Sequence, residues 1–158
     1  MKKMKIFAFI FFSFSSTAIW SQTVASCGES EGVSHYHYAT ILSKKNSGFT
    51  KDRITNGMIS VKKMPDGSYD ILLVDVRKKI LSMVQDGGKV GLLRKGNNDA
   101  TFMLYFPNNS IEIFTFWIDA EGNKRYDHLS SKGGDATLIH KSSVLTGQCD
   151  EINLIEIN

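Results

Sequence analysis

The sequence predicts an all-β domain, an antiparallel up-and-down barrel or sandwich of about eight short strands. Apolar or alternating segments recur along the chain, and turn-forming residues separate them at fairly regular intervals. There is no internal repeat and no proline-rich linker, and the only two prolines each stand beside a turn signal. These observations favour one domain with a single core.

The expected strands span residues 35–42, 57–63, 69–76, 90–93, 100–106, 111–118, 124–130, 136–140 and 143–147. Hairpin turns connect several of them. In Pro65-Asp66-Gly67 the proline presets φ and the glycine accepts a positive φ, so this tripeptide predicts a tight turn. The sequences PNN at 107–109 and DAEGN at 119–123 predict two further turns.

Residues 75–86 allow two interpretations. Val76, Ile80 and Val84 have helical spacing, and Asp75 and Gly87 suit the start and the end of a short helix. The alternative is a turn followed by a strand. The flanking segments are β, which favours the strand.

The segment 111–118 is apolar on both faces of the expected strand. Ile111, Ile113 and Trp117 alternate with Phe114 and Phe116. Strands that are buried on both sides have this pattern. We therefore expect another segment of the chain to cover the outer face.

Residues 1–25 read as a secretory signal peptide. Three lysines precede an apolar run over residues 6–12, and small residues follow at 23–25. A membrane anchor needs about 20 continuous apolar residues, whereas serines and a threonine interrupt this run. The prediction is a cut after Ala25, which leaves a single β domain over residues 26–158 in the periplasm or outside the cell.

Removal of the signal peptide changes the charge of the chain. The full sequence has 19 basic and 16 acidic side chains, and residues 1–25 hold three of the lysines and no acid. The mature domain therefore carries 16 of each, with basic pairs spread along it. A nucleic-acid binder has a concentrated basic excess, so we expect no nucleic-acid partner.

The two cysteines, Cys27 and Cys149, lie near the two ends of the mature domain. An even count in an oxidising compartment favours a disulfide between them. Val24-Ala25-Ser26-Cys27 also fits a bacterial lipobox loosely, so a lipid anchor on Cys27 is the alternative. A reactive thiol would need a base such as His35, and no Cys/His signature surrounds either cysteine.

His35 and His37 are the candidate metal ligands, because residues two apart on a strand point the same way. A structural zinc site needs four protein ligands and a catalytic site three. No further ligand cluster stands out, so a pair of partly exposed histidines is the favoured interpretation. The sequence contains no catalytic constellation and no cofactor motif, and we expect neither.

A set of cysteines and turn residues spans most of the mature domain: Cys27-Gly28, Ser30, Gly32 and Tyr36, then residues 66–71, residues 131–134 and Cys149. With these residues the chain resembles a group of short exported bacterial proteins of unknown function. The resemblance implies a domain bracketed by two cysteines and supplies no activity. The pair His35 and His37 is not part of its pattern, which further disfavours a metal site.

Size, disulfide and the lack of a catalytic set favour a non-enzymatic binding module, inhibitor-like or immunity-like, that acts on a protein partner. One alternative is a lipocalin-like carrier of a small apolar ligand. A small hydrolase with a site built from scattered residues is a third possibility.

Overall fold

The computed structural model describes residues 21–74, 77–135 and 137–157. These ranges contain ten strands and two short 3-10 helices. In chain order they are β1 (Gln22–Tyr36), η1 (Lys44–Asn46), β2 (Gly48–Ile54), β3 (Met58–Lys63), β4 (Tyr69–Val74), β5 (Ile80–Ser82), β6 (Lys89–Lys95), β7 (Asp99–Phe106), β8 (Ser110–Ile118), β9 (Lys124–Lys132), β10 (Lys141–Ile152) and η2 (Leu154–Glu156).

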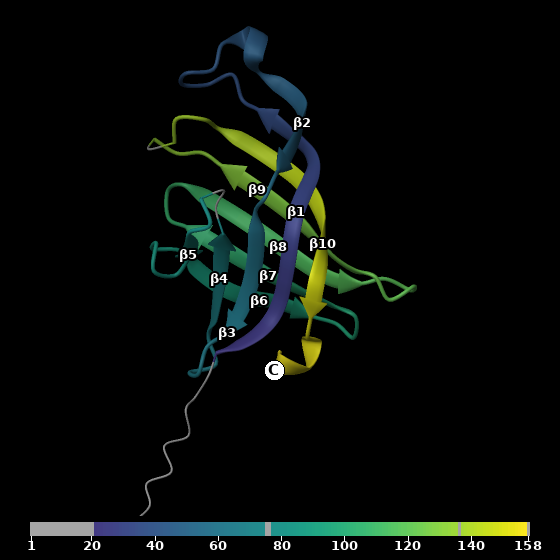
Figure 1. Ribbon diagram of the computed structural model, residues 1–158. Helices are drawn as coiled ribbons and strands as arrows, with labels where there is room; N and C mark the ends of the chain where they lie inside the picture. Colours follow the sequence, from purple (N-terminus) through teal and green to yellow (C-terminus); the bar gives the residue numbers. More distant parts are fainter. Residues whose placement is uncertain (1–20, 75–76, 136, 158) are drawn as a thin grey trace, which may run out of the picture.

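All ten strands form one antiparallel sheet. Its order is β5-β4-β3-β1-β10-β9-β8-β7-β6, and β2 pairs with β1 beside this path. The sheet curls into a half-barrel in which β3, β4 and β5 lie across from β6, β7, β8 and β9 (Figure 1). The all-β, antiparallel prediction is confirmed.

Strand β1 is the seam of the sheet. One edge pairs with β10 along most of its length. The other edge pairs with β3 over residues 22–27 and with β2 over residues 30–36. The register shifts between Cys27 and Ser30, so Gly28 and Glu29 form a bulge where the edge changes partner.

Close packing of β1 against β10 requires glycine at position 32. A Cβ on Gly32 would lie 2.1 Å from the carbonyl oxygen of Val144, which no side chain tolerates. A strand glycine of this kind marks a close approach of two backbones.

The core fills the concave side of the half-barrel. Period-two alternation turns Phe114 and Phe116 of β8 inward, where they belong to one core cluster with buried residues of β4 and β7. The largest fully buried apolar side chains are Phe102, Phe114, Phe116, Ile71, Leu104, Ile157, Val24 and Val61. The rings of Phe102 and Phe116 pack edge to face with centroids 6.0 Å apart.

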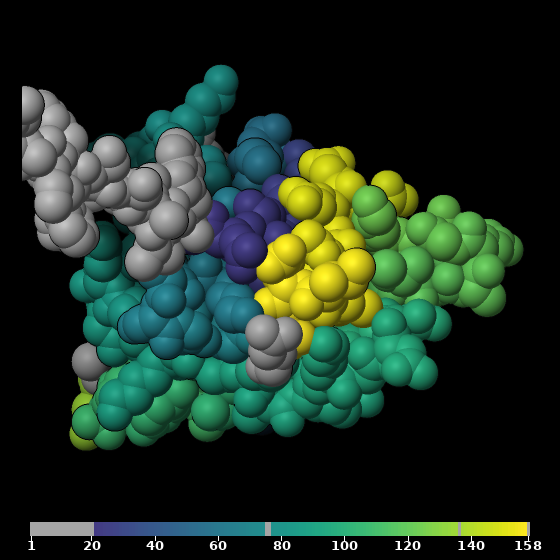
Figure 2. All heavy atoms as spheres, turned by 90° about the horizontal axis from the view of Figure 1, so that it is seen from below, coloured from purple at the N-terminus to yellow at the C-terminus, as the bar shows by residue number. Residues whose placement is uncertain are grey.

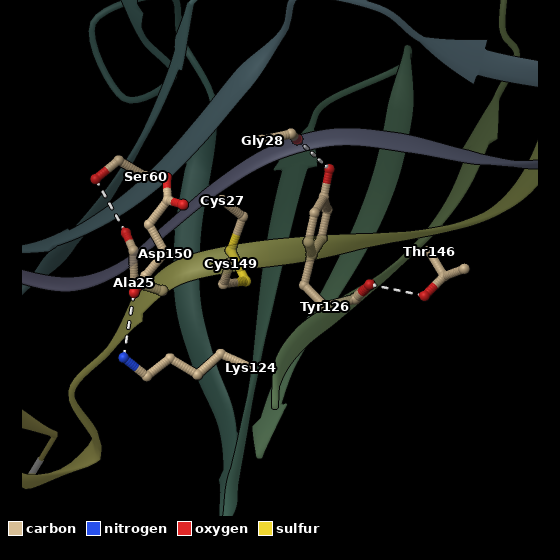
Figure 3. Close-up of a disulfide and its surroundings, with 9 residues drawn as sticks. All are labelled: Ala25, Cys27, Gly28, Ser60, Lys124, Tyr126, Thr146, Cys149 and Asp150. Carbon is tan, nitrogen blue, oxygen red and sulfur yellow. Dashed lines mark hydrogen bonds between the residues drawn. A yellow bond between two sulfur atoms is a disulfide. The ribbon is translucent and has the colours of Figure 1, made fainter. Parts of the chain in front are cut away.

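Cys27 and Cys149 form a disulfide, as predicted. They are directly opposed in the β1–β10 register, and the bond closes a separation of 122 residues (Figure 3). Tyr126, whose hydroxyl donates to the carbonyl of Gly28, stands beside the bridge. Since the Cys27 sulfur is bonded to Cys149, it is not available for a lipid.

Several strand boundaries differ from the prediction. The first strand begins at Gln22, well before residue 35, and ends at Tyr36. Strand β2 was not predicted, because its residues GFTKDRI are mostly polar and exposed. A hydrogen bond from Thr137 N to Gly134 O closes a turn, and residues 138 and 139 form a bend, so the strand prediction for 136–140 is wrong over its described part.

Of the two interpretations of residues 75–86, the turn followed by a strand is the one that the structure shows over the described residues. Ile80, Leu81 and Ser82 form β5 and pair with β4, and a turn over residues 83–87 follows. Residues 77–86 contain no helix. Residues 75 and 76 lie outside the described part of the chain.

The outer face of the sheet is not covered as expected. Val33, Val144 and Leu129 are cross-strand partners on this face, and all three are exposed. Ile111 is 47 % exposed. In residues 111–118, Ile111 therefore faces solvent, whereas Ile113 and Trp117 of the same face are partly buried.

The disulfide predicts a specific loss of stability on its removal. The double variant Cys27→Ala, Cys149→Ala should lower the free energy of unfolding by roughly 4 to 5 kcal/mol, because the unfolded chain regains the entropy of a long loop. Urea unfolding of the oxidised protein and of the variant measures this difference. A variant as stable as the oxidised protein would contradict the assignment.

Candidate functional site

The concave face changes from apolar to polar along the half-barrel. Beside the disulfide it is lined by aromatic and aliphatic side chains. Toward the other end, one buried cross-strand row consists of Ser34, Ser143, Ser130 and Glu112. The hydroxyls of Ser34 and Ser143 lie 2.6 Å apart, and Ser143 is the donor in this contact because Ser34 donates to Asp52. A polar, buried row on a core-facing surface is unusual, which makes this end of the concave face a candidate functional site.

A pocket of about 270 Å³ lies between these two regions of the concave face. One wall is the cross-strand row Ile59, Leu73 and Leu81 of β3, β4 and β5. The opposite wall is formed by Phe114 of β8 and Tyr126 of β9. The remaining lining residues are Gly28, Ile54, Gly57, Met58, Val74, Glu112, His128 and Lys132.

Three ionisable side chains meet in the wall of this pocket. Glu112 Oε2 lies 2.9 Å from His128 Nε2, and Lys132 Nζ lies 3.2 Å from Glu112 Oε1. The Glu112 and His128 side chains are only 8 % and 9 % exposed, whereas that of Lys132 is 40 % exposed. The imidazole also stacks on Phe114, with centroids 4.4 Å apart. We call Glu112, His128 and Lys132 the charged cluster.

Glu112 is held as an anion. Burial by itself raises the pKa of this carboxyl, but the hydrogen bond with His128 and the positive charge of Lys132 outweigh it, so the pKa is lowered. Both carboxylate oxygens are engaged. Such a group suits a fixed electrostatic role rather than proton exchange near neutral pH.

Tyr126 joins the pocket to the bulge of β1. Its hydroxyl donates to Gly28 O at 3.0 Å, and burial raises the pKa of the phenol (Figure 3). The hydroxyl therefore stays protonated and acts as a donor. A side chain at position 28 would not be obstructed within 4 Å, so the glycine leaves open space beside the pocket.

A second polar group, centred on Asp52 of β2, is structural. Asp52 Oδ2 accepts from Ser34 Oγ at 2.5 Å and lies 2.9 Å from Lys141 Nζ. Burial raises the pKa of Asp52, but the hydrogen bonds of Ser34 and Lys141 lower it more. These contacts tie β2 to β1 and β10, which explains how a short, polar strand stays attached to the seam.

The histidine pair lies away from the pocket. The rings of His35 and His37 are neighbours, with centroids 5.2 Å apart. His35 packs against Phe49, and His37 Nε2 lies 3.5 Å from Ser142 Oγ. Within the described residues, no group of three or more His, Cys, Asp or Glu side chains is arranged to hold a metal ion.

The segment between β1 and β2 and the segment between β9 and β10 meet at one end of the half-barrel. His37 N donates to His140 O at 3.0 Å, and the Thr40 hydroxyl donates to Leu138 O. Around these bonds is an exposed apolar surface, which we call the tip patch. It consists of Tyr38, Ile41, Phe49, Leu138 and Ile139.

Sequence reasoning missed the charged cluster, although one signal was present. Glu112 is the only charged residue on the inward face of β8, which otherwise carries Ser110, Phe114, Phe116 and Ile118. A carboxylate among aromatic residues indicates a buried partner. The partners themselves come from the register of β9, which places His128 opposite Phe114 and Lys132 opposite Ser110.

Comparison with protein-family models, with curated proteins and with solved structures finds no match to this chain. Among the described residues, no helix is long and apolar enough to cross a membrane. The function therefore has to be argued from the site itself.

The charged cluster predicts a pH dependence of stability. Because the pKa of Glu112 is lower in the folded chain than in the unfolded chain, Glu112 stabilises the fold above about pH 4.3. This contribution disappears as the pH falls through the lower, folded pKa. Urea midpoints measured at about pH 7 and about pH 3 should therefore differ less for Glu112→Gln than for the wild type.

At neutral pH the same substitution should cost about 1 to 3 kcal/mol, since it weakens a charge-assisted hydrogen bond. Glu151→Gln, at an exposed position of β10, is the matched control and should behave as the wild type. Equal pH profiles for the wild type and Glu112→Gln would show that the cluster does not carry this dependence.

Proposed function

We propose that the protein is an exported, non-enzymatic binding protein that holds the apolar part of a small amphipathic molecule in the concave pocket. The observation that carries the proposal is a pocket whose walls are largely apolar and whose polar groups gather at one side, in the charged cluster. Small-molecule sites commonly combine apolar walls with a few polar groups of fixed position.

The walls supply the affinity in this proposal. Ile59, Leu73 and Leu81 face Phe114 and Tyr126 across the pocket, so an apolar chain between them loses its contact with water. Ligand pockets usually measure about 300 to 1,000 Å³, and this one lies just below that range. The size suits a short alkyl chain rather than a drug-sized molecule.

The charged cluster supplies the orientation. Glu112 and His128 are buried and fix each other, whereas Lys132 remains partly exposed. Its ammonium group has donors to spare beyond the single contact with Glu112. An anionic head group at the mouth of the pocket would meet this ammonium.

The chemistry of the cluster favours binding over catalysis. The His128 ring nitrogen Nε2 is bonded to a carboxylate and not to a hydroxyl or thiol, and both cysteines are in the disulfide. Nucleophilic catalysis needs a nucleophile within hydrogen-bond reach of its base.

Export agrees with the disulfide, since such bonds persist in oxidising compartments. The resemblance of the sequence to short exported bacterial proteins points the same way. We place the protein in the periplasm or outside the cell.

Isothermal titration with decanoate tests the pocket. The wild type should bind it, and Leu81→Trp should weaken binding about tenfold or more, because the larger side chain fills the pocket from its rim. Leu93→Trp places the same ring at another exposed strand position, outside the pocket lining, and should bind as the wild type. Lys132→Gln should weaken decanoate more than decanol.

No heat of binding for the wild type with either probe, or equal affinities for Leu81→Trp and Leu93→Trp, would reject the pocket as the site. Thermal unfolding of each variant confirms that it is folded.

A protein partner is the second candidate, and the tip patch favours it. Phe49 is 81 % exposed and Tyr38 is 69 % exposed, and aromatic residues of this kind anchor protein interfaces. An inhibitor-like or immunity-like role would use this surface rather than the pocket.

The test is affinity capture from the native cell envelope with three forms of the protein. A partner bound directly through the tip patch should be retained by the wild type and by Leu93→Ser, and lost by Phe49→Ser. Equal recovery on all three forms would exclude the tip patch as its binding surface.

A further inference from the structure

The first residues of β1 occupy the middle of the sheet. Ala25 pairs with Val61 of β3 on one side and with Ile152 of β10 on the other. Seen from below, the purple start of β1 lies between the blue segment around the β3–β4 turn and the yellow C-terminal segment (Figure 2). Residues 22–25 are therefore part of the folded sheet and not a segment that precedes it.

The side chains at this point are buried. Val24 is 1 % exposed and Ala25 is 0 % exposed, and both belong to the hydrophobic core. The ladder to β3 is irregular between Thr23 and Ala25, and η2 at the C-terminal end also contacts β1. A cut after Ala25 would remove two buried apolar side chains from the core.

The backbone and side-chain bonds of this segment would also be lost. Asn153 N donates to Val24 O at 2.7 Å, and Ser60 Oγ donates to Ala25 O at 3.0 Å. Lys62 Nζ contacts the hydroxyl of Thr23. Without residues 22–25, the facing edges of β3 and β10 would keep unpaired polar groups beside the core, which is costly.

We propose that the export signal is removed on the N-terminal side of Gln22, so that the mature protein retains residues 22–25. The inference rests on the proposed export. Small residues near a cut favour two bonds, the one after Ala18, with Ser16 two residues before it, and the one after Ser21. Water adds across that peptide bond, which leaves a carboxylate on the released peptide and a new amine on the mature chain.

The position of the cut also fixes the chemistry of Cys27. A lipobox cysteine carries its lipid as the first residue of the mature protein, whereas a chain that retains residues 22–26 has Cys27 inside β1. The thiol is then free to form the disulfide with Cys149. A cut before Gln22 is thus compatible with the disulfide between Cys27 and Cys149.

The test expresses the full chain with its own leader in a Gram-negative host and measures the intact mass and N-terminal sequence of the fractionated protein. A first residue of Ile19 or of Gln22, either as a free amine or cyclised with loss of ammonia, supports the proposal. A first residue of Ser26, or a lipid on Cys27, overturns it while leaving export intact. A chain that keeps its N-terminal residues uncut also overturns the proposal, because the export signal is then not removed.

A variant adds an independent readout. Ala18→Arg combined with Ser21→Arg removes the small residue before both candidate bonds and leaves Ala25 unchanged. We expect the precursor to accumulate uncut. Continued release of a mature chain beginning at Ser26 would overturn the proposal, and decanoate binding by the wild type, measured separately, reports on the pocket alone.

Discussion

The fold depends on one strand that serves three partners. β1 pairs with β10 along one edge, and its other edge is divided between β3 and β2. The bulge at Gly28 and Glu29 makes this division possible, because two residues leave the ladder where the partner changes. The disulfide fixes β1 to β10 next to that bulge. The concave face, the pocket and the attachment of β2 all follow from this arrangement.

Much of the fold was accessible from the sequence because its hairpins are local. The turn at residues 65–67 joins β3 to β4, and the turns at 107–109 and 119–123 join the strands from β7 to β9. The first half of β1 was not accessible. Its partners come from distant parts of the chain, and its small residues, which permit close packing, are the same types that surround a signal cleavage site.

For the candidate site too, some features could be predicted from the sequence and others required the register of the strands. The pairing of Cys27 with Cys149 followed from a count of two. The charged cluster needed the register of β8 and β9, which brings Glu112 to His128 across the ladder. Glu112 alone, among inward aromatic residues, was a visible anomaly whose partners the sequence could not name. The spacing of His35 and His37 made them candidate metal ligands, but the pair lies away from the pocket, beside Phe49.

The disulfide lies on one side of the pocket and the charged cluster on the other, and this asymmetry bears on local opening. Near Cys27 and Cys149, β1 and β10 cannot separate while the bond is intact. Toward Ser34 and Ser143 the same two strands are held only by hydrogen bonds and packing. Local separation of β1 and β10 is therefore restricted by the bond at one end only, and partial opening at the polar end would need less free energy than global unfolding. The covalent bond fixes the register of the two strands beside the apolar part of the core.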